Sequence, residues 1–232
     1  SKAVQYMKHP LRAYSLISKW GWTRCLPDEI HLKIMYRALI GKNINLDNPK
    51  GFNEKLNWLK LHDRNPLYNI LVDKLAVKQW VADKIGAQYV SETYDSWDRV
   101  ESISLENLPD QFALKTNHDS GGVAICRDKS SFDFDAAKRV LRKHLNSNYF
   151  WWTREWPYKD VVPLVMAEEY LEDEGLDTGL VDYKVTCFNG NPRLIEVHRG
   201  RFGEHTCNYY DQDWNPVSID WAGIPVSPVE VE

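Results

Sequence analysis

The chain has 232 residues, a formal net charge of -4, 43% apolar residues and 27% charged residues. These values are typical of a globular protein of one or two domains and exclude wholesale disorder. The acidic balance argues against nucleic-acid binding, and no stretch approaches the roughly 20 apolar residues that a membrane span needs.

The N-terminal segment and the cysteines bear on where the protein works. Residues 1–22 contain no uninterrupted apolar stretch and no small-residue cleavage site, so we expect no signal peptide. Residues 11–22 are mildly amphipathic and could contact a membrane surface, although a helix docked on the protein is the stronger expectation. The four cysteines have no CxxC spacing, which indicates neither a zinc site nor a disulfide framework. We therefore expect a cytoplasmic protein.

Helices are predicted for the first part of the chain. Apolar residues recur at helical spacing in three segments, residues 27–41, 51–63 and 73–86. Gly41 and Gly86 end the first and the third, which favours helix termination there. The apolar residues that we expect the third helix to bury are Leu75, Val77, Trp80 and Val81.

Strands are predicted after Gly86, with one further helix at residues 132–147. The predicted strands are residues 87–94, 111–116, 123–126, 163–171, 182–188, 191–197 and 205–211. Asn189 and Gly190 predict a tight hairpin turn, because both residue types tolerate a positive φ angle. The order indicates an α+β protein with a helical N-terminal region followed by two small α+β lobes, divided near residue 165.

A polar loop follows the strand at residues 111–116. Lys115 ends that strand, and the N–H groups of Ser120, Gly121 and Gly122 could point at one phosphate because glycine has no Cβ. An ordinary hairpin turn with a solvated lysine explains the same residues, and no Walker GK[ST] follows. Lys74, at a helix start, is either a second cation for that phosphate or an exposed lysine.

Two further groups of charged residues stand out. Alternation along residues 163–171 places Glu168 and Glu169 on opposite faces, so that one carboxylate could point inward and accept a bond from adenine. A solvated strand end is the alternative. The hairpin carries six ionisable residues, which indicate a polar cleft or cross-strand ion pairs: Asp182, Lys184, Glu196, His198, Arg199 and Arg201. His198 and His205 could be ligands or bases, but their spacing alone defines no metal site.

Taken together, the motifs resemble the ATP-grasp superfamily, and most closely its TupA-like branch, which is linked to bacterial surface polysaccharides and teichuronopeptide. They occur in the order of that family over roughly residues 50–215. The resembling motifs are "GFNEKLNWLKLHD", "LVDKLAVKQWVADKIGAQYV", "FALKTNHDSGG", "DYKVTCFNG" and "RFGEHTCNYYDQDW". The resemblance implies an ATP-grasp fold, in which two small α+β lobes grip the nucleotide.

The resemblance also implies roles for individual residues. Lys74 and Lys115 would hold the phosphates of ATP, and the loop of Ser120, Gly121 and Gly122 would close over them. Glu168, with the backbone of Glu169 and Leu171, would form the hinge that binds adenine. Lys184 would face the phosphate side of the cleft. Arg201 and His205 would face the acceptor substrate. The implied parts are a helical region (1–65), a pre-grasp helix and strand (66–106), a first lobe (107–165) and a second lobe (166–232).

Two departures from the family pattern limit these assignments. His198 stands where an acidic residue is expected. Family members also continue with a helix, an "RVDxY"-like strand and a "GExTF"-like strand, which would supply the acidic ligands of magnesium, and neither string occurs in the 232 residues. We therefore expect the second lobe to be incomplete and assign no metal ligand.

The implied function is ATP- and Mg²⁺-dependent ligation of a carboxylate to an amine through an acyl phosphate. The expected substrates are an amino acid and a uronic-acid carboxylate of a bacterial surface polysaccharide or its precursor, and the aromatic segment 149–158 could stack on the sugar or pack in the core. One alternative is a glycosyltransferase that uses a nucleotide sugar. Its usual DxD motif is matched only by "DFD" at a helix start and "DQD" in a turn. The other alternative is a non-catalytic ATP- or glycan-binding protein.

Overall fold

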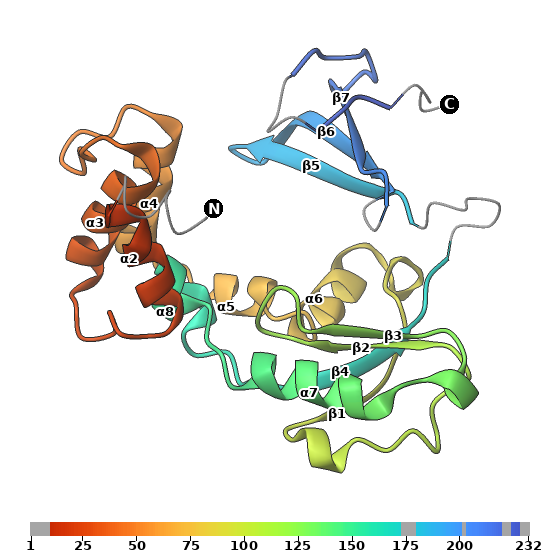
Figure 1. Cartoon of the computed structure of the whole chain (residues 1–232). Helices are drawn as coiled ribbons and strands as arrows, with labels where there is room; N and C mark the ends of the chain where they lie inside the picture. Colours follow the sequence, from red (N-terminus) through yellow and green to blue (C-terminus); the bar gives the residue numbers. More distant parts are fainter. Residues whose placement is uncertain (1–9, 173–179, 201–202, 220–223, 228–232) are drawn as a thin grey trace. The chain divides into compact units, whose positions relative to one another are not determined.

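The computed structural model describes residues 10–172, 180–200, 203–219 and 224–227 (Figure 1). The chain divides into two compact units, Ser1–Tyr170 and Leu171–Glu232. The first unit combines helices with a four-stranded sheet, and the second contains a three-stranded sheet. This mixture fits the predicted α+β class. No helix in the described part of the chain is both long and apolar enough to cross a membrane.

The first unit begins with helices. They are α2 (Pro10–Lys19), α3 (Asp28–Ile40), α4 (Phe52–His62), α5 (Leu67–Val72) and α6 (Ala76–Ile85). The three predicted helices are confirmed as α3, α4 and α6, and Gly41 caps α3 with a φ of 80°. The short α5 was not predicted. Helix α2 docks on α3, where the Tyr14 hydroxyl lies 3.0 Å from Nδ1 of His31.

The expected burial of α6 is wrong. Its apolar side chains, among them Val77 and Trp80, are only half-buried, and the helix contains no fully buried residue. The helix packs mainly against α5 and the short 3-10 turn η1 (Ala87–Tyr89), which together cover only part of its apolar face. The buried residues of the helical region lie mostly on α3, namely His31, Leu32, Met35 and Ala38.

The four-stranded sheet has the order β1-β4-β2-β3, and every neighbouring pair is antiparallel. Its strands are β1 (Thr93–Trp97), β2 (Phe112–Thr116), β3 (Val123–Cys126) and β4 (Val165–Glu169). The strand predicted at 87–94 begins only at Thr93. Residues 87–90 instead form a turn, in which the Tyr89 and Val90 amides bond back to Gly86 and Ala87.

The core of the first unit lies between this sheet and α7 (Phe134–Leu145), which Figure 1 shows against β2 and β3. Phe112 and Leu114 of β2 and Leu141 of α7 are fully buried there. Because side chains alternate along a strand, Lys115 points to the opposite face of the sheet from Leu114. Three further 3-10 turns, η2 (Val100–Ser102), η3 (Lys129–Ser131) and η4 (Trp156–Tyr158), and the short helix α8 (Phe150–Thr153) complete the unit.

The second unit contains β5 (Asp182–Phe188), β6 (Asn191–Arg199) and β7 (Thr206–Tyr210) in the order β5-β6-β7. All pairs are antiparallel. The predicted hairpin turn is confirmed, since Asn189 and Gly190 have φ angles of 51° and 77°. Two positive φ angles in succession match the right-handed twist of the flanking strands.

Candidate functional site

A cavity of about 610 Å³ in the first unit lies beside the end of β2 and the loop between β2 and β3. Its lining includes all five residues that the sequence assigned to the phosphates, namely Lys74, Lys115, Ser120, Gly121 and Gly122. Lys74 comes from the segment before α6 and Lys115 from β2, so residues 41 positions apart in sequence meet at one cavity. Their role in binding a nucleotide stays a prediction.

The loop that follows β2 has a buried half and an exposed half. Asn117 and His118 are fully buried and Asp119 is 7% exposed, whereas Ser120 and Gly121 lie at the surface. The sequence suggested one open polar loop, and its first three residues instead form part of the interior. Buried polar side chains need hydrogen-bond partners, and those partners fix the geometry of the loop.

Asn117 is the centre of that hydrogen-bond network. Its side-chain amide donates to Asp73 Oδ1 and to the carbonyl of Val162, both at 3.0 Å. Its Oδ1 accepts the N–H of Leu164 at 2.8 Å. One side chain thereby joins the end of β2 to the segment before α6 and to the segment that enters β4.

Lys74 is held against the same loop. Its backbone N–H donates to the Asn117 carbonyl at 3.0 Å, and its ammonium donates to the carbonyls of Thr116, at 3.3 Å, and Asp119. Burial lowers the pKa of Lys74, and the nearby Asp119 carboxylate opposes that shift while Lys115 adds to it. The lysine therefore both lines the cavity and fixes the loop that surrounds it.

The glycine end of the loop is closely packed. A Cβ at Gly122 would overlap Oγ1 of Thr116 and lie 2.7 Å from Cβ of His144. The Thr116 hydroxyl cannot move away cheaply, because it donates to Asp119, whose other carboxylate oxygen contacts Nδ1 of His144. Gly121 has a φ of 103°, which a residue with a side chain rarely adopts.

Glu168 forms ion pairs with two lysines on the inner side of β4. Lys115 contacts its Oε1, and Nζ of Lys78 lies 2.9 Å from its Oε2. The carboxylate is buried and Glu169 is half-buried, but Val165, Met166 and Ala167 are buried as well, so burial along this strand does not alternate. The sequence analysis did not single out Lys78. The available signal was its position four residues after Lys74, because a helix predicted over residues 73–86 places two residues at this spacing on one face.

The remaining predicted site residues are Glu169, Leu171, Lys184, Arg201 and His205. The N–H of Glu169 donates to the Glu92 carbonyl at 3.0 Å, so that amide already has a backbone partner. Leu171, Lys184 and His205 belong to the second unit, which is described by itself. Lys184 is exposed on β5 opposite Glu196, and His205 contacts His198. Arg201 lies outside the described residues.

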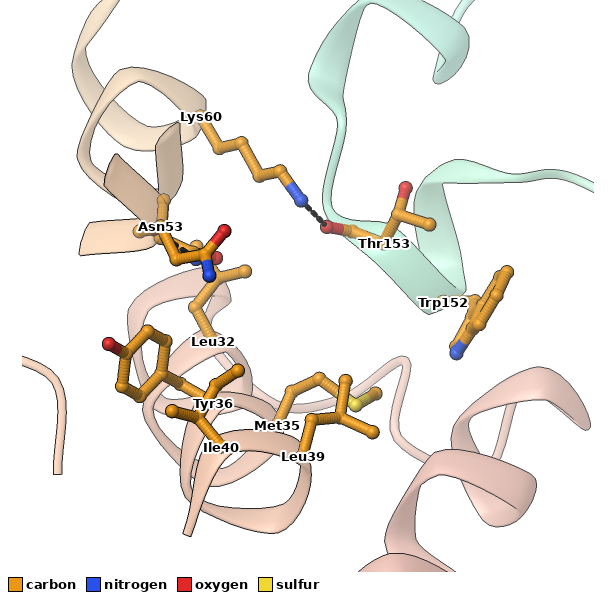
Figure 2. Close-up of a pocket in the computed structure, with 10 residues that line it drawn as sticks. Leu32, Met35, Tyr36, Leu39, Ile40, Asn53, Lys60, Trp152 and Thr153 are labelled. Carbon is orange, nitrogen blue, oxygen red and sulfur yellow. Dashed lines mark hydrogen bonds between the residues drawn. The ribbon is translucent and has the colours of Figure 1, made fainter. Parts of the chain in front are cut away.

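The aromatic segment 149–158 is divided between different environments. Tyr149 and Tyr158 line the lysine cavity. Trp152 instead lines a separate, mainly apolar cavity of about 210 Å³, across which Figure 2 shows it facing residues of α3. On its polar side, Lys60 donates to the Thr153 carbonyl at 3.0 Å. The sequence analysis treated these aromatic residues as one cluster. The fold places them at two cavities, although the rings of Tyr149 and Trp152 are in edge-to-face contact, with centroids 5.5 Å apart.

Comparison with known proteins adds one finding to this geometry. Residues 54–229 match the family model described as TupA-like ATPgrasp, which covers well over half of the 232 residues and includes every residue that lines the lysine cavity. No curated protein and no solved structure matches the chain. The family match, and not an individual relative, is therefore the comparison on which a function can be based.

Proposed function

Because the chain belongs to the TupA-like ATP-grasp family, we propose that it is an ATP-dependent ligase that joins the amine of an amino acid to a carboxylate. The observation that carries the proposal is the cavity of the first unit. Two lysines, Lys74 and Lys115, line it together with the glycine-containing loop. Ammonium groups and backbone N–H groups beside one hollow are the donors that bind phosphate groups.

Lys115 is the residue that we expect to contact phosphate most directly. It stands on a rigid strand, and its ammonium is paired with Glu168, which keeps a second partner in Lys78. Lys115 can therefore turn to an incoming phosphate without leaving the buried carboxylate unpaired. Lys74 has a second role, because its ammonium donates hydrogen bonds to carbonyls of the loop. These bonds hold the loop in place and fix the position of the positive charge.

In the proposed reaction ATP supplies the phosphoryl group that converts the carboxylate into an acyl phosphate. The amine then attacks the acyl carbon, the C–O bond to phosphate breaks, and the amide, phosphate and a proton are released. Lys74 and Lys115 would neutralise charge on the phosphates, and the loop would exclude water from them. Catalysis of phosphoryl transfer consists largely of such positioning and electrostatic stabilisation.

Magnesium, which the family implies, does not fit the described residues of this cavity. The two carboxylates that line it are Asp119 and Glu155. Asp119 is bound by Thr116 and His144, and Glu155 lies 3.5 Å from Nζ of Lys60. Magnesium requires oxygen ligands that are free to face the ion. We therefore assign no magnesium ligand and derive no step through the ion.

We further propose that the carboxylate belongs to a uronic acid of a surface polysaccharide or its precursor. This part rests on the family resemblance and on Tyr149 and Tyr158, whose rings line the lysine cavity and could stack on a sugar. Tyr158→Leu and Trp152→Ala separate the two aromatic locations, because Tyr158 lines the lysine cavity and Trp152 lines the apolar one. If the sugar stacks at the lysine cavity, Trp152→Ala leaves the KM for the acceptor unchanged and Tyr158→Leu raises it.

The first experiment is binding of a non-hydrolysable ATP analogue in the presence of Mg²⁺, compared with UDP-sugars. Lys115→Met should weaken binding of the analogue about 10–100-fold, because a hydrogen bond to a charged group contributes about 1.5–3 kcal/mol. Lys143→Met is the matched control, since Lys143 is an exposed lysine of α7 outside the cavity lining. Binding of UDP-sugars alone would point to a glycosyltransferase and overturn the ligase proposal.

The second experiment tests the chemistry. ADP should be released only when both an amino acid and a uronic acid are present, and ¹⁸O from the acid carboxylate should appear in the released phosphate. Binding of the ATP analogue without any ADP release under these conditions would favour a non-catalytic binding protein. Transfer of the label separates a ligase from an ATPase, because simple hydrolysis takes its oxygen from water.

A further inference from the structure

The second unit contains a cluster of three buried side chains that the proposed ligase reaction does not use. Glu196 and His198 are two residues apart on β6, so both point to the same face of the sheet. Cys207 of β7 is the direct partner of His198 in the antiparallel register and shares that face. All three are nearly inaccessible to solvent, with exposures of 6%, 5% and 1% in this order.

The distances within the cluster suit a metal ion. One ligand atom from each residue lies within 4.8 Å of the other two. Nε2 of His198 lies 3.1 Å from Oε2 of Glu196 and 3.8 Å from Sγ of Cys207. Typical zinc–ligand bond lengths and a tetrahedral angle give separations of about 3.4 Å for O···N and about 3.6 Å for N···S. The side chains are therefore already close to the positions that a shared ion requires.

The surroundings of His198 support this geometry. Its other ring nitrogen, Nδ1, lies 3.0 Å from Nε2 of His205. A histidine that binds metal through Nε2 carries its proton on Nδ1, and that proton needs an acceptor. His205 supplies the acceptor, which fixes the tautomer and the orientation of the His198 ring. His205 is therefore a positioning residue for His198.

We propose that Glu196, His198 and Cys207 bind one transition-metal ion of the zinc class, which joins β6 to β7 in the second unit. Thiolate, imidazole and carboxylate together are a zinc-type donor set, whereas magnesium prefers oxygen ligands alone. Three protein ligands leave the fourth tetrahedral position to a water molecule. The ligase reaction proposed above assigns no role to Glu196, His198 or Cys207, so the metal site can be tested separately from it.

The test uses the full chain, freed of any affinity tag and stripped of metal, and titrated with Co²⁺ as a spectroscopic substitute for Zn²⁺. A thiolate ligand produces an intense charge-transfer band in the near ultraviolet, and tetrahedral Co²⁺ gives strong visible bands. We expect both to saturate at one equivalent and Zn²⁺ to displace the Co²⁺. Zn²⁺ should also raise the melting temperature of the second unit, because a ligand that binds only the folded state stabilises it.

Variants assign the ligands. Cys207→Ser should abolish the charge-transfer band, whereas Cys187→Ser should retain it, because Cys187 is the exposed cysteine on β5 of the same unit. His205→Gln should keep the band and weaken binding about 10–100-fold, as loss of a partner of a metal ligand typically does. Glu196→Gln preserves the shape of the side chain and should weaken metal binding. This variant tests the site if the Cys207→Ser chain does not fold.

Two outcomes would overturn the proposal. One is a folded wild-type chain that takes up no Co²⁺ or Zn²⁺ at one equivalent. The other is a charge-transfer band that survives in a folded Cys207→Ser chain. Either result would leave the cluster as a hydrogen-bonded part of the sheet, and neither would affect the ATP-binding experiments.

Discussion

Replacing Asn117 with alanine tests whether the buried polar network holds the candidate site together. The change removes four side-chain hydrogen bonds, three of 2.8–3.0 Å to Asp73, Val162 and Leu164, and one of 3.2 Å between Oδ1 and Nδ1 of His118. A buried group left without its partner costs about 1–3 kcal/mol. The four partner groups are not equivalent. Val162 is 68% exposed, so water can replace its lost bond, and Asp73 keeps the N–H groups of Leu75 and Ala76.

Most of the cost therefore comes from the Leu164 N–H, from Nδ1 of the buried His118 and from the space left by the side chain. We expect the free energy of unfolding of the first unit to fall by about 2–4 kcal/mol. Urea denaturation followed by tryptophan fluorescence measures this, because eight of the ten tryptophans lie within Ser1–Tyr170. With a typical denaturant slope, the midpoint should fall by about 1–2 M.

Asn57→Ala is the matched control. Asn57 makes one helix-surface bond, to the carbonyl of Asn53 at 2.8 Å, and its loss should change stability by less than about 0.5 kcal/mol. If Asn117→Ala also stays within about 0.5 kcal/mol of the wild type, the network does not stabilise the loop, and the account given for Lys74 fails with it.

Two further predictions concern steric and pH effects in the first unit. Gly122→Ala should destabilise this unit by about 1–3 kcal/mol, because the added Cβ overlaps Thr116 and crowds His144. Gly203→Ala, in the second unit, meets open space and should be neutral. A Gly122→Ala chain whose first unit melts at the wild-type temperature would contradict the packing argument. Burial lowers the pKa of His31 in the folded chain below its ordinary value of about 6.5. Between these two pKa values the unfolded chain binds more protons than the folded chain. The free energy of unfolding should therefore fall as the pH drops below about 6.5. His31→Gln should remove this part of the pH dependence in urea titrations at several pH values, and an unchanged slope would show that other groups cause it.

Much of the fold could be predicted from the sequence because it depends on local physics. The strands β2 and β3 and the helices α3 and α4 follow from the spacing of apolar residues along the chain. The turn at Asn189 and Gly190 follows from the φ angles that these two residues tolerate. The prediction was wrong where packing against other elements decides burial. Helix α6 is the example, because the short elements that it packs against do not bury any of its residues fully.

The sequence predicted which residue types form the candidate site, because phosphate binding uses lysines and glycines beside the end of a strand. Their assembly was decided only by the tertiary structure. Lys78 meets Glu168 across 90 positions of sequence, and nothing local to either residue indicates the pair. In the same way, His198 and Cys207 are nine positions apart with no recognisable spacing, and only the antiparallel register of β6 and β7 places them side by side. Periodicity determines which face a residue occupies, but strand pairing and packing determine which other residue it meets there.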